Sequence, residues 1–235
     1  MIPISDINPA RNTPVVSRIF MVLAVLIYFL IQPKDINSLF NFFYQYASIP
    51  CELNNMSPLS ELQFYYNDCK IVSNEYIFQN KNLYFSVIVS NLLHANFVHL
   101  IGNLWSFWIF GNNVEDKLGK FMFITFLISS AFFSVFSHTI LNLNSITPIV
   151  GASGIVSGLM GAYVYLFPNA KLLVLVPLGF LFPTTIKAKY FMIFWFVSQV
   201  FLSFGTQNIS WEAHLGGFVF GYLILRLFNY RRYRL

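Results

Sequence analysis

Long runs of apolar residues, separated by short polar segments, divide the chain from end to end. Six of these runs come close to the roughly 17–25 residues that a helix needs to cross a bilayer. They predict membrane spans at about 16–32, 98–113, 120–141, 150–168, 188–205 and 213–229. The second run is short and carries polar residues, so hydropathy supports it least. The pattern predicts an all-α membrane protein with six transmembrane helices.

Two further segments leave alternatives open. A seventh apolar run, "LLVLVPLGFLF" at 172–182, is too short for a span and is interrupted by Pro177. It is interpreted as an interfacial loop, with a re-entrant segment as the alternative. The loop 33–97, between the first two spans, holds both cysteines, Cys51 and Cys69. They can form a disulfide in an oxidising compartment or remain two unpaired buried thiols.

Composition and charge support a membrane location and give its orientation. Only 10% of the residues are charged, against about 25% in soluble proteins. The net charge of +5 does not indicate a nucleic-acid partner, because the basic residues are dispersed. With the N-terminus in the cytoplasm, only three of the 14 Lys and Arg residues lie outside: Lys34, Lys70 and Lys81. We therefore expect a cytoplasmic segment at 1–15, a membrane domain at 16–229 and a basic cytoplasmic tail at 230–235.

Four polar side chains lie at one predicted depth in the membrane. His99 and Asn103 are four residues apart and share a face of the second span. Ser153 lies in the first turn of the fourth span, and His214 in the first turn of the sixth. These three spans all run from outside to inside, so the four side chains are expected just below the outer surface. No Asp or Glu lies in the middle of a span, which weighs against a pump or transporter.

Together these groups are the parts needed for acyl transfer. A serine such as Ser153 becomes a good nucleophile when a base such as His214 takes its proton. Free N–H groups at the start of the fourth span, with Asn103 and His99, can stabilise an oxyanion. Two other interpretations of Ser153 are a small packing residue and a hydroxyl bonded to its own helix.

Glycines beside these residues fit the same plan. Gly151 and Gly154 flank the approach to Ser153 without a Cβ, so a substrate backbone can come close. Gly154 on the fourth span, with Gly217 and Gly221 on the sixth, forms surfaces of small residues that let helices pack closely. Packing alone is the simpler interpretation of these glycines, and the two roles are compatible.

Four motifs in order resemble a known family: "HANFVHLIGN" (94–103), "GNNVEDKLG" (111–119), "GASG" (151–154) and "AHLGGFVFG" (213–221). From about residue 84 to 225 the chain is similar to the rhomboid intramembrane serine proteases. Each motif alone is a weak signal, but four in the right order are a strong one. The resemblance implies a six-transmembrane-helix rhomboid-like bundle with both termini cytoplasmic.

The resemblance also implies residue roles. Ser153 and His214 correspond to a catalytic dyad, with His99 and Asn103 in the oxyanion hole. Motif residues with structural roles are His94, which helps to hold the outer loop, Glu115 at the cytoplasmic end of the second span, Gly151, Gly154, Gly217 and Gly221. Some rhomboids carry an aromatic residue against the base histidine where this chain has Ser157.

These observations predict a serine endopeptidase that needs no cofactor or metal and cleaves single-span or other membrane-protein substrates. A bacterial plasma membrane is the expected location. One alternative is an inactive rhomboid-like protein that binds or escorts membrane clients, although such relatives typically lose the serine or the histidine. The other is a metalloprotease or metal transporter using His94, His99 and His214. It is disfavoured because the chain has no HExxH motif and no carboxylate at hand.

Overall fold

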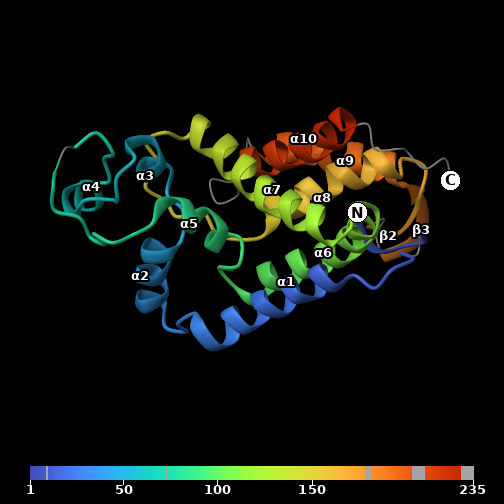
Figure 1. Cartoon of the computed structure of the whole chain (residues 1–235), viewed down its shortest axis with the longest axis horizontal. Coiled ribbons are helices and arrows are strands. Elements are labelled where there is room, and N and C mark those ends of the chain that lie inside the picture. Colours follow the sequence, from blue (N-terminus) through green and yellow to red (C-terminus); the bar gives the residue numbers. More distant parts are fainter. Residues whose placement is uncertain (9, 72, 178–180, 203–209, 229–235) are drawn as a thin grey trace.

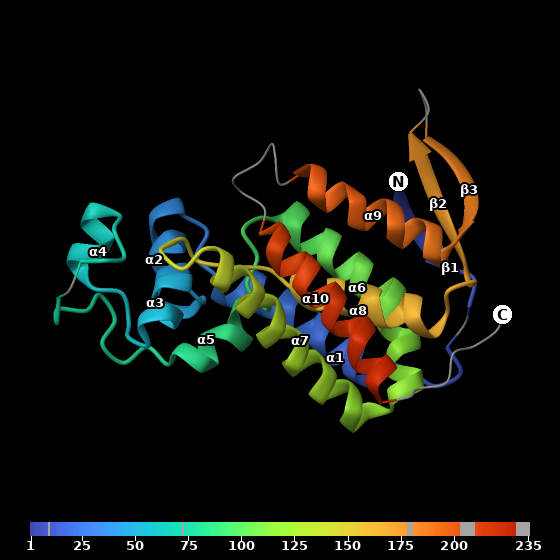
Figure 2. The same ribbon diagram turned by 90° about the horizontal axis from the view of Figure 1, so that it is seen from above.

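The computed structural model describes residues 1–8, 10–71, 73–177, 181–202 and 210–228. Over these residues the chain forms a helical bundle with a group of short helices at one end and a small sheet at the other (Figures 1 and 2). Parts of four predicted features lie outside the described residues: 178–180 of the apolar run 172–182, the end of the fifth span at 203–205, residue 229 of the sixth span, and the tail 230–235.

Six helices build the bundle at the positions where hydropathy predicted spans. They are α1 (Val15–Leu26, continued by a π-helical turn at Ile27–Ile31), α6 (Phe97–Leu118), α7 (Lys120–Leu141), α8 (Ser153–Leu166), α9 (Ala188–Leu202) and α10 (Trp211–Leu227). α8 contacts α6, α7, α9 and α10, and nearly all of its side chains are buried. The helix that begins with Ser153 therefore lies at the centre of the fold (Figure 2).

The helices of the bundle differ from one another in length. α6 has 22 residues and is longer than predicted, whereas α8 has 14 and is shorter. Among the described residues, Lys120–Leu141 is the one helix whose length and hydropathy alone satisfy the usual criterion for a span. Shorter apolar helices cover Val15–Ile31, Ser153–Leu166 and Ala188–Phe201.

The prediction of an all-α fold is wrong in one respect, because the structure contains a three-stranded antiparallel sheet in the order β1-β2-β3. β2 (Lys171–Pro177) and β3 (Leu181–Lys187) form a hairpin from the run interpreted as a loop or re-entrant segment. β1 (Ile2–Asp6) comes from the N-terminal segment and pairs with β2. Leu172 and Val174 are buried on one face of β2, the period of two typical of a strand.

The segment 33–97 is folded rather than an open loop. It contains α2 (Ile36–Tyr46), α3 (Pro50–Asn55), α4 (Glu61–Tyr66) and α5 (Leu83–Ser90), which gather at the end of the bundle away from the sheet (Figure 1). Of the two alternatives for the cysteines, the structure has the disulfide between Cys51 and Cys69. The Lys81 ammonium pairs with the Glu52 carboxylate at 2.6 Å, and both side chains are buried. These two links join α3 to the segment that follows α4.

Candidate functional site

Ser153 is the first residue of α8 and is held there by the turn that precedes it. Gly151 has a φ of 117°, a conformation that favours glycine, and its N–H donates to the carbonyl of Ser90 at 2.9 Å. A Cβ at Gly151 would overlap with the ring of His99. Glycine at this position thus lets the chain turn tightly and lets His99 lie directly beside it.

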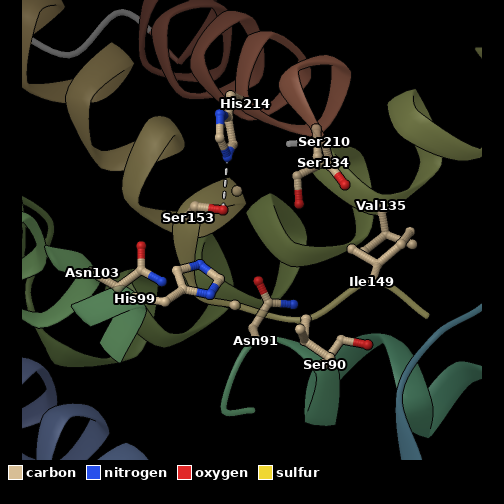
Figure 3. A pocket seen from close by; sticks show the side chains of 14 residues that line it. Ser90, Asn91, His99, Asn103, Ser134, Val135, Ile149, Ser153, Ser210 and His214 are labelled. Atoms are coloured by element: carbon tan, nitrogen blue, oxygen red, sulfur yellow. Dashed lines mark hydrogen bonds between the residues drawn. The ribbon is translucent and has the colours of Figure 1, made fainter. Parts of the chain in front are cut away.

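His214 lies in the first turn of α10 and points at Ser153 (Figure 3). Its Nε2 is 2.8 Å from the Ser153 Oγ, which is hydrogen-bond distance. The indole of Trp195, on α9, lies with its ring centroid 6.4 Å from that of His214. Ser157, by contrast, donates its hydroxyl to the Ser153 carbonyl at 2.7 Å and so does not hold the imidazole. The aromatic neighbour of the histidine in this chain comes from α9.

Backbone contact between α8 and α10 brings the serine and the histidine together. A Cβ at Gly217 would overlap with the carbonyl oxygen of Gly154, and one at Gly221 with that of Gly158. A Cβ at Gly161 would likewise overlap with the backbone of Phe218. Any larger residue at these glycines would push the two helices apart and lengthen the Ser153–His214 contact.

Possible oxyanion donors lie across the site from His214. Asn103 is buried, and its Nδ2 has no hydrogen-bond partner within the described part of the chain. His99 lies one turn before it on α6, and both side chains face Gly151 (Figure 3). The first-turn N–H groups of α8 also lack intrahelical partners, and the positive end of the helix dipole lies here. The site therefore presents several donors to a negatively charged oxygen near Ser153.

A cavity of about 300 Å³ opens beside these residues. Its wall is rich in polar side chains from five elements and the loops between them: Ser90, Asn91, His99, Asn103, Ser134, Ser153, Ser210 and His214. The rest of the lining is apolar and includes Val135, Ile149 and Val150. No group of three His, Cys, Asp or Glu residues placed to hold a metal occurs within the described residues.

His94 and Glu115 lie outside the cavity and hold the structure around it. His94 is fully buried, and its backbone N–H and carbonyl bond the side chain of Gln32, each at 2.9 Å. Glu115 accepts hydrogen bonds from the N–H groups of Val16 and Ser17 and from the Ser17 hydroxyl, at 2.7–2.8 Å. It therefore caps the start of α1.

The structure also adds residues that sequence reasoning missed. The Oε1 of Gln199, on α9, lies 2.7 Å from the Nδ1 of His214. A polar residue in an apolar helix needs a partner, and this rule could have singled out Gln199 from the sequence.

Glu212 turns away from the site, and its carboxylate bonds the His138 Nδ1 at 3.0 Å and the Asn142 side chain at 3.1 Å. His138 is thus a structural hydrogen-bonder on α7.

Comparison with known proteins agrees with this arrangement. A family model described as the rhomboid domain matches residues 81–231, more than half of the chain. The chain belongs to the rhomboid family, which confirms the resemblance predicted from the motifs. Rhomboids are helical integral membrane proteins, and the family includes intramembrane serine proteases that act on membrane-protein substrates.

Similar curated proteins come from several membranes. The chain is 32% identical over 145 residues to "Rhomboid protein 1, mitochondrial" of Saccharomyces cerevisiae, covering 59% of this chain and 40% of that protein. It is 31% identical over 137 residues to "Rhomboid protease GlpG" of Photorhabdus laumondii, covering 58% and 45%. It is 26% identical over 159 residues to "Rhomboid-like protein 11, chloroplastic" of Arabidopsis thaliana, covering 66% and 56%. The chain spans only about half the length of these relatives.

Proposed function

We propose that this chain is an intramembrane serine endopeptidase that cleaves membrane-protein substrates near the outer face of the membrane. The observation that carries the proposal is the 2.8 Å contact between the Ser153 Oγ and the His214 Nε2 at the wall of a cavity that several polar side chains line. Membership of a family that includes such proteases supports the same chemistry.

In the proposed reaction, His214 acts first as a base. Its Nε2 takes the hydroxyl proton while the Ser153 Oγ attacks the carbonyl carbon of the scissile peptide bond. The resulting imidazolium then protonates the leaving amine, and an acyl-enzyme forms. A water from the cavity then attacks the ester carbonyl while the same Nε2 takes one of its protons. The second tetrahedral intermediate collapses, the imidazolium returns this proton to the Ser153 Oγ, and the acid product is released.

The negative charge on the oxygen of each tetrahedral intermediate requires hydrogen-bond donors. These donors have to lie across the site from His214. The Asn103 amide, the His99 ring and the backbone N–H of Ser153 are the groups placed for this. Because they are already oriented before substrate binds, little reorganisation is needed as the charge develops. The unpartnered Asn103 Nδ2 is available for this role.

We assign α1, α6, α7, α8, α9 and α10 as six spans with both chain ends in the cytoplasm, the predicted membrane domain 16–229. The distribution of basic residues supports this orientation. It places the segment 33–97 outside, where a Cys51–Cys69 disulfide is stable in an oxidising compartment. For the location we propose a bacterial plasma membrane. The named relatives include mitochondrial and chloroplastic proteins as well as bacterial ones.

The substrates proposed are single-span proteins whose helix is weak near its outer end. A peptide bond inside a regular helix is shielded, and unwinding it in lipid leaves backbone groups unsatisfied at several kcal/mol each. Ser153, at the outer end of α8, is reached by a segment that unravels into the cavity. The small space beside Gly151 favours a small residue before the cut.

The test is co-expression with model single-span substrates that carry Gly or Pro near the outer end of the span. Ser153→Ala and His214→Ala should each reduce cleavage to background, and the double variant should be no worse, because the pair acts as a unit. Ser157→Ala, one turn further along α8, is the matched control and should keep most activity. Mass spectrometry of the products should place the cuts in the outer third of the span.

Two results would contradict the proposal. Cleavage that persists in Ser153→Ala would exclude the nucleophile, and cuts in the cytoplasmic half of the span would exclude the orientation. A chain that binds these substrates equally well with Ser153 or alanine, and cuts none of them, would instead be a non-cleaving rhomboid that binds or escorts its clients.

A further inference from the structure

The second ring nitrogen of His214 has a partner that a serine–histidine pair does not require. Its Nδ1 lies 2.7 Å from the Oε1 of Gln199, which is 5% exposed and lies on α9. An amide oxygen only accepts hydrogen bonds, so the Nδ1 must carry the proton. The neutral ring then has its lone pair on Nε2, the atom that faces the Ser153 hydroxyl at 2.8 Å.

The same helix holds the imidazole in a second way. Trp195 and Gln199 are four residues apart and share a face of α9. The indole lies beside the imidazole ring with an interplanar angle of 38°, while the amide of Gln199 binds its edge. One face of α9 thus contacts His214 through both its ring and its Nδ1.

Other polar groups near His214 do not replace this contact. The titratable groups whose charges act on His214 are His99 on α6, His138 on α7 and Glu212 on α10 itself. Glu212 is occupied by His138 and Asn142, and its carboxylate oxygens take those two hydrogen bonds. The partner of the Nδ1 is therefore an uncharged amide on a neighbouring helix.

We propose that Gln199 is a positioning residue that fixes the tautomer and orientation of the His214 ring. This proposal rests on the proposed protease function. It follows that the base is competent only while α9 packs against α10, since an outward displacement of α9 removes both the amide and the indole.

The first test compares pH–rate profiles of the purified chain in liposomes with a single-span substrate. Gln199→Met keeps the size of the side chain and removes the acceptor. It should lower kcat by about 10- to 100-fold with little change in KM, because the imidazolium formed in the reaction loses a charge-assisted hydrogen bond. Ser198→Ala is the control: its hydroxyl bonds the Trp195 carbonyl on the same helix and should not affect the rate.

Gln199→Glu separates positioning from simple packing. Its carboxylate accepts the same hydrogen bond but stabilises the imidazolium, so a higher pH is needed to obtain the neutral base. The acidic limb of the kcat/KM profile should move up by about 1–3 pH units, with activity at high pH above that of Gln199→Met. His99, His138 and Glu212 are unchanged in all these variants. A difference between the variants is therefore due to the side chain at position 199.

A second readout does not depend on turnover. With ¹⁵N-labelled histidine and His214→Gln as the assignment control, the His214 signals should show the proton on Nδ1 in Ser153→Ala, and a loss of that preference when Gln199→Met is added. Wild-type kcat in Gln199→Met, or the same tautomer with and without Gln199, would overturn the proposal. Absence of Ser153-dependent cleavage would overturn the protease function instead, and the tautomer measurement would still decide the role of Gln199.

Discussion

At the scale of single residues, two asparagines on the cavity wall differ in what their amides are free to do. Asn91 donates its Nδ2 to the Val87 carbonyl at 2.8 Å, four residues earlier in the chain. The Nδ2 of Asn103 has no such partner within the described residues, even though the residue is buried and only 7% exposed. A buried donor without a partner is unfavourable in the resting protein and becomes useful when an oxyanion arrives.

We therefore expect Asn103→Ala to lower kcat by about 10²–10³-fold, the usual effect of losing one oxyanion donor. Folding should be little affected, since the Nδ2 of Asn103 has no hydrogen bond to lose within the described part of the chain. Asn91→Ala is the matched control: it alters the same wall but should leave kcat within a small factor of wild type. Single-turnover cleavage rates of the two variants provide the comparison, and equal rates would remove Asn103 from the site.

Individual helices in this fold are fixed at their ends by residues far away in the sequence. The start of α1 is capped not by a residue of its own turn but by Glu115, near the end of α6. The N–H groups of the first turn of a helix have no intrahelical partners, so a carboxylate there satisfies them and interacts favourably with the helix dipole. Glu115 is 3% exposed, which makes this cap part of the packing between α1 and α6.

Replacing this cap should destabilise the bundle. Glu115→Ala leaves the N–H groups of the partly buried Val16 and the buried Ser17 unpaired, and we expect a loss of about 1–3 kcal/mol in the free energy of unfolding. Asp116→Ala is the control, because that carboxylate binds Asn12 where solvent can replace it, and its effect should stay within about 0.5 kcal/mol. Unfolding in mixed micelles measures both, and similar losses in the two variants would refute the capping role.

Considered as a whole, the molecule holds its N-terminal strand through pairing with β2 and through a half-buried carboxylate. The Oδ2 of Asp6, at the end of β1, accepts hydrogen bonds from the Tyr163 hydroxyl at 2.8 Å and from the Asn113 side chain at 2.5 Å. Burial raises the pKa of Asp6 from 3.8 to about 6, and the hydrogen bonds from the Tyr163 hydroxyl and the Asn8 backbone only partly oppose the shift. The docked strand thus prefers the protonated carboxyl.

Docking of β1 should depend on pH in the direction set by this shift. The pKa of Asp6 is higher in the docked strand than in the free strand. The contribution of Asp6 to the free energy of docking is therefore most favourable below about pH 4, declines up to about pH 6 and is constant at higher pH. Amide hydrogen exchange of residues 2–6, corrected for intrinsic rates, should show weaker protection at pH 8 than at pH 5. Asp6→Asn keeps an acceptor oxygen without the charge and should abolish the difference; a difference that persists would exclude Asp6 as its source.

Much of the bundle could be predicted because lipid imposes one strong rule, that spans are apolar helices. The sheet could not, because in "LLVLVP" every position is apolar and the buried positions Leu172 and Val174 do not stand out. The candidate dyad followed from the prediction that three spans run in the same direction, which brings their first turns to one depth. Gln199 escaped notice because its partner lies on another helix, and the spacing of two cysteines alone does not reveal whether they pair.

The pairing of β1 with β2 has a consequence for how the protein is made. Ile2 lies opposite Leu175, so the first strand to be synthesised has no partner until four of the six bundle helices have followed it. During that interval β1 has unpaired backbone groups to which another extended chain can bind. Closure of the sheet therefore marks a late stage of synthesis. Nascent chains arrested before residue 171 should expose an N-terminal strand that chains arrested after residue 187 conceal.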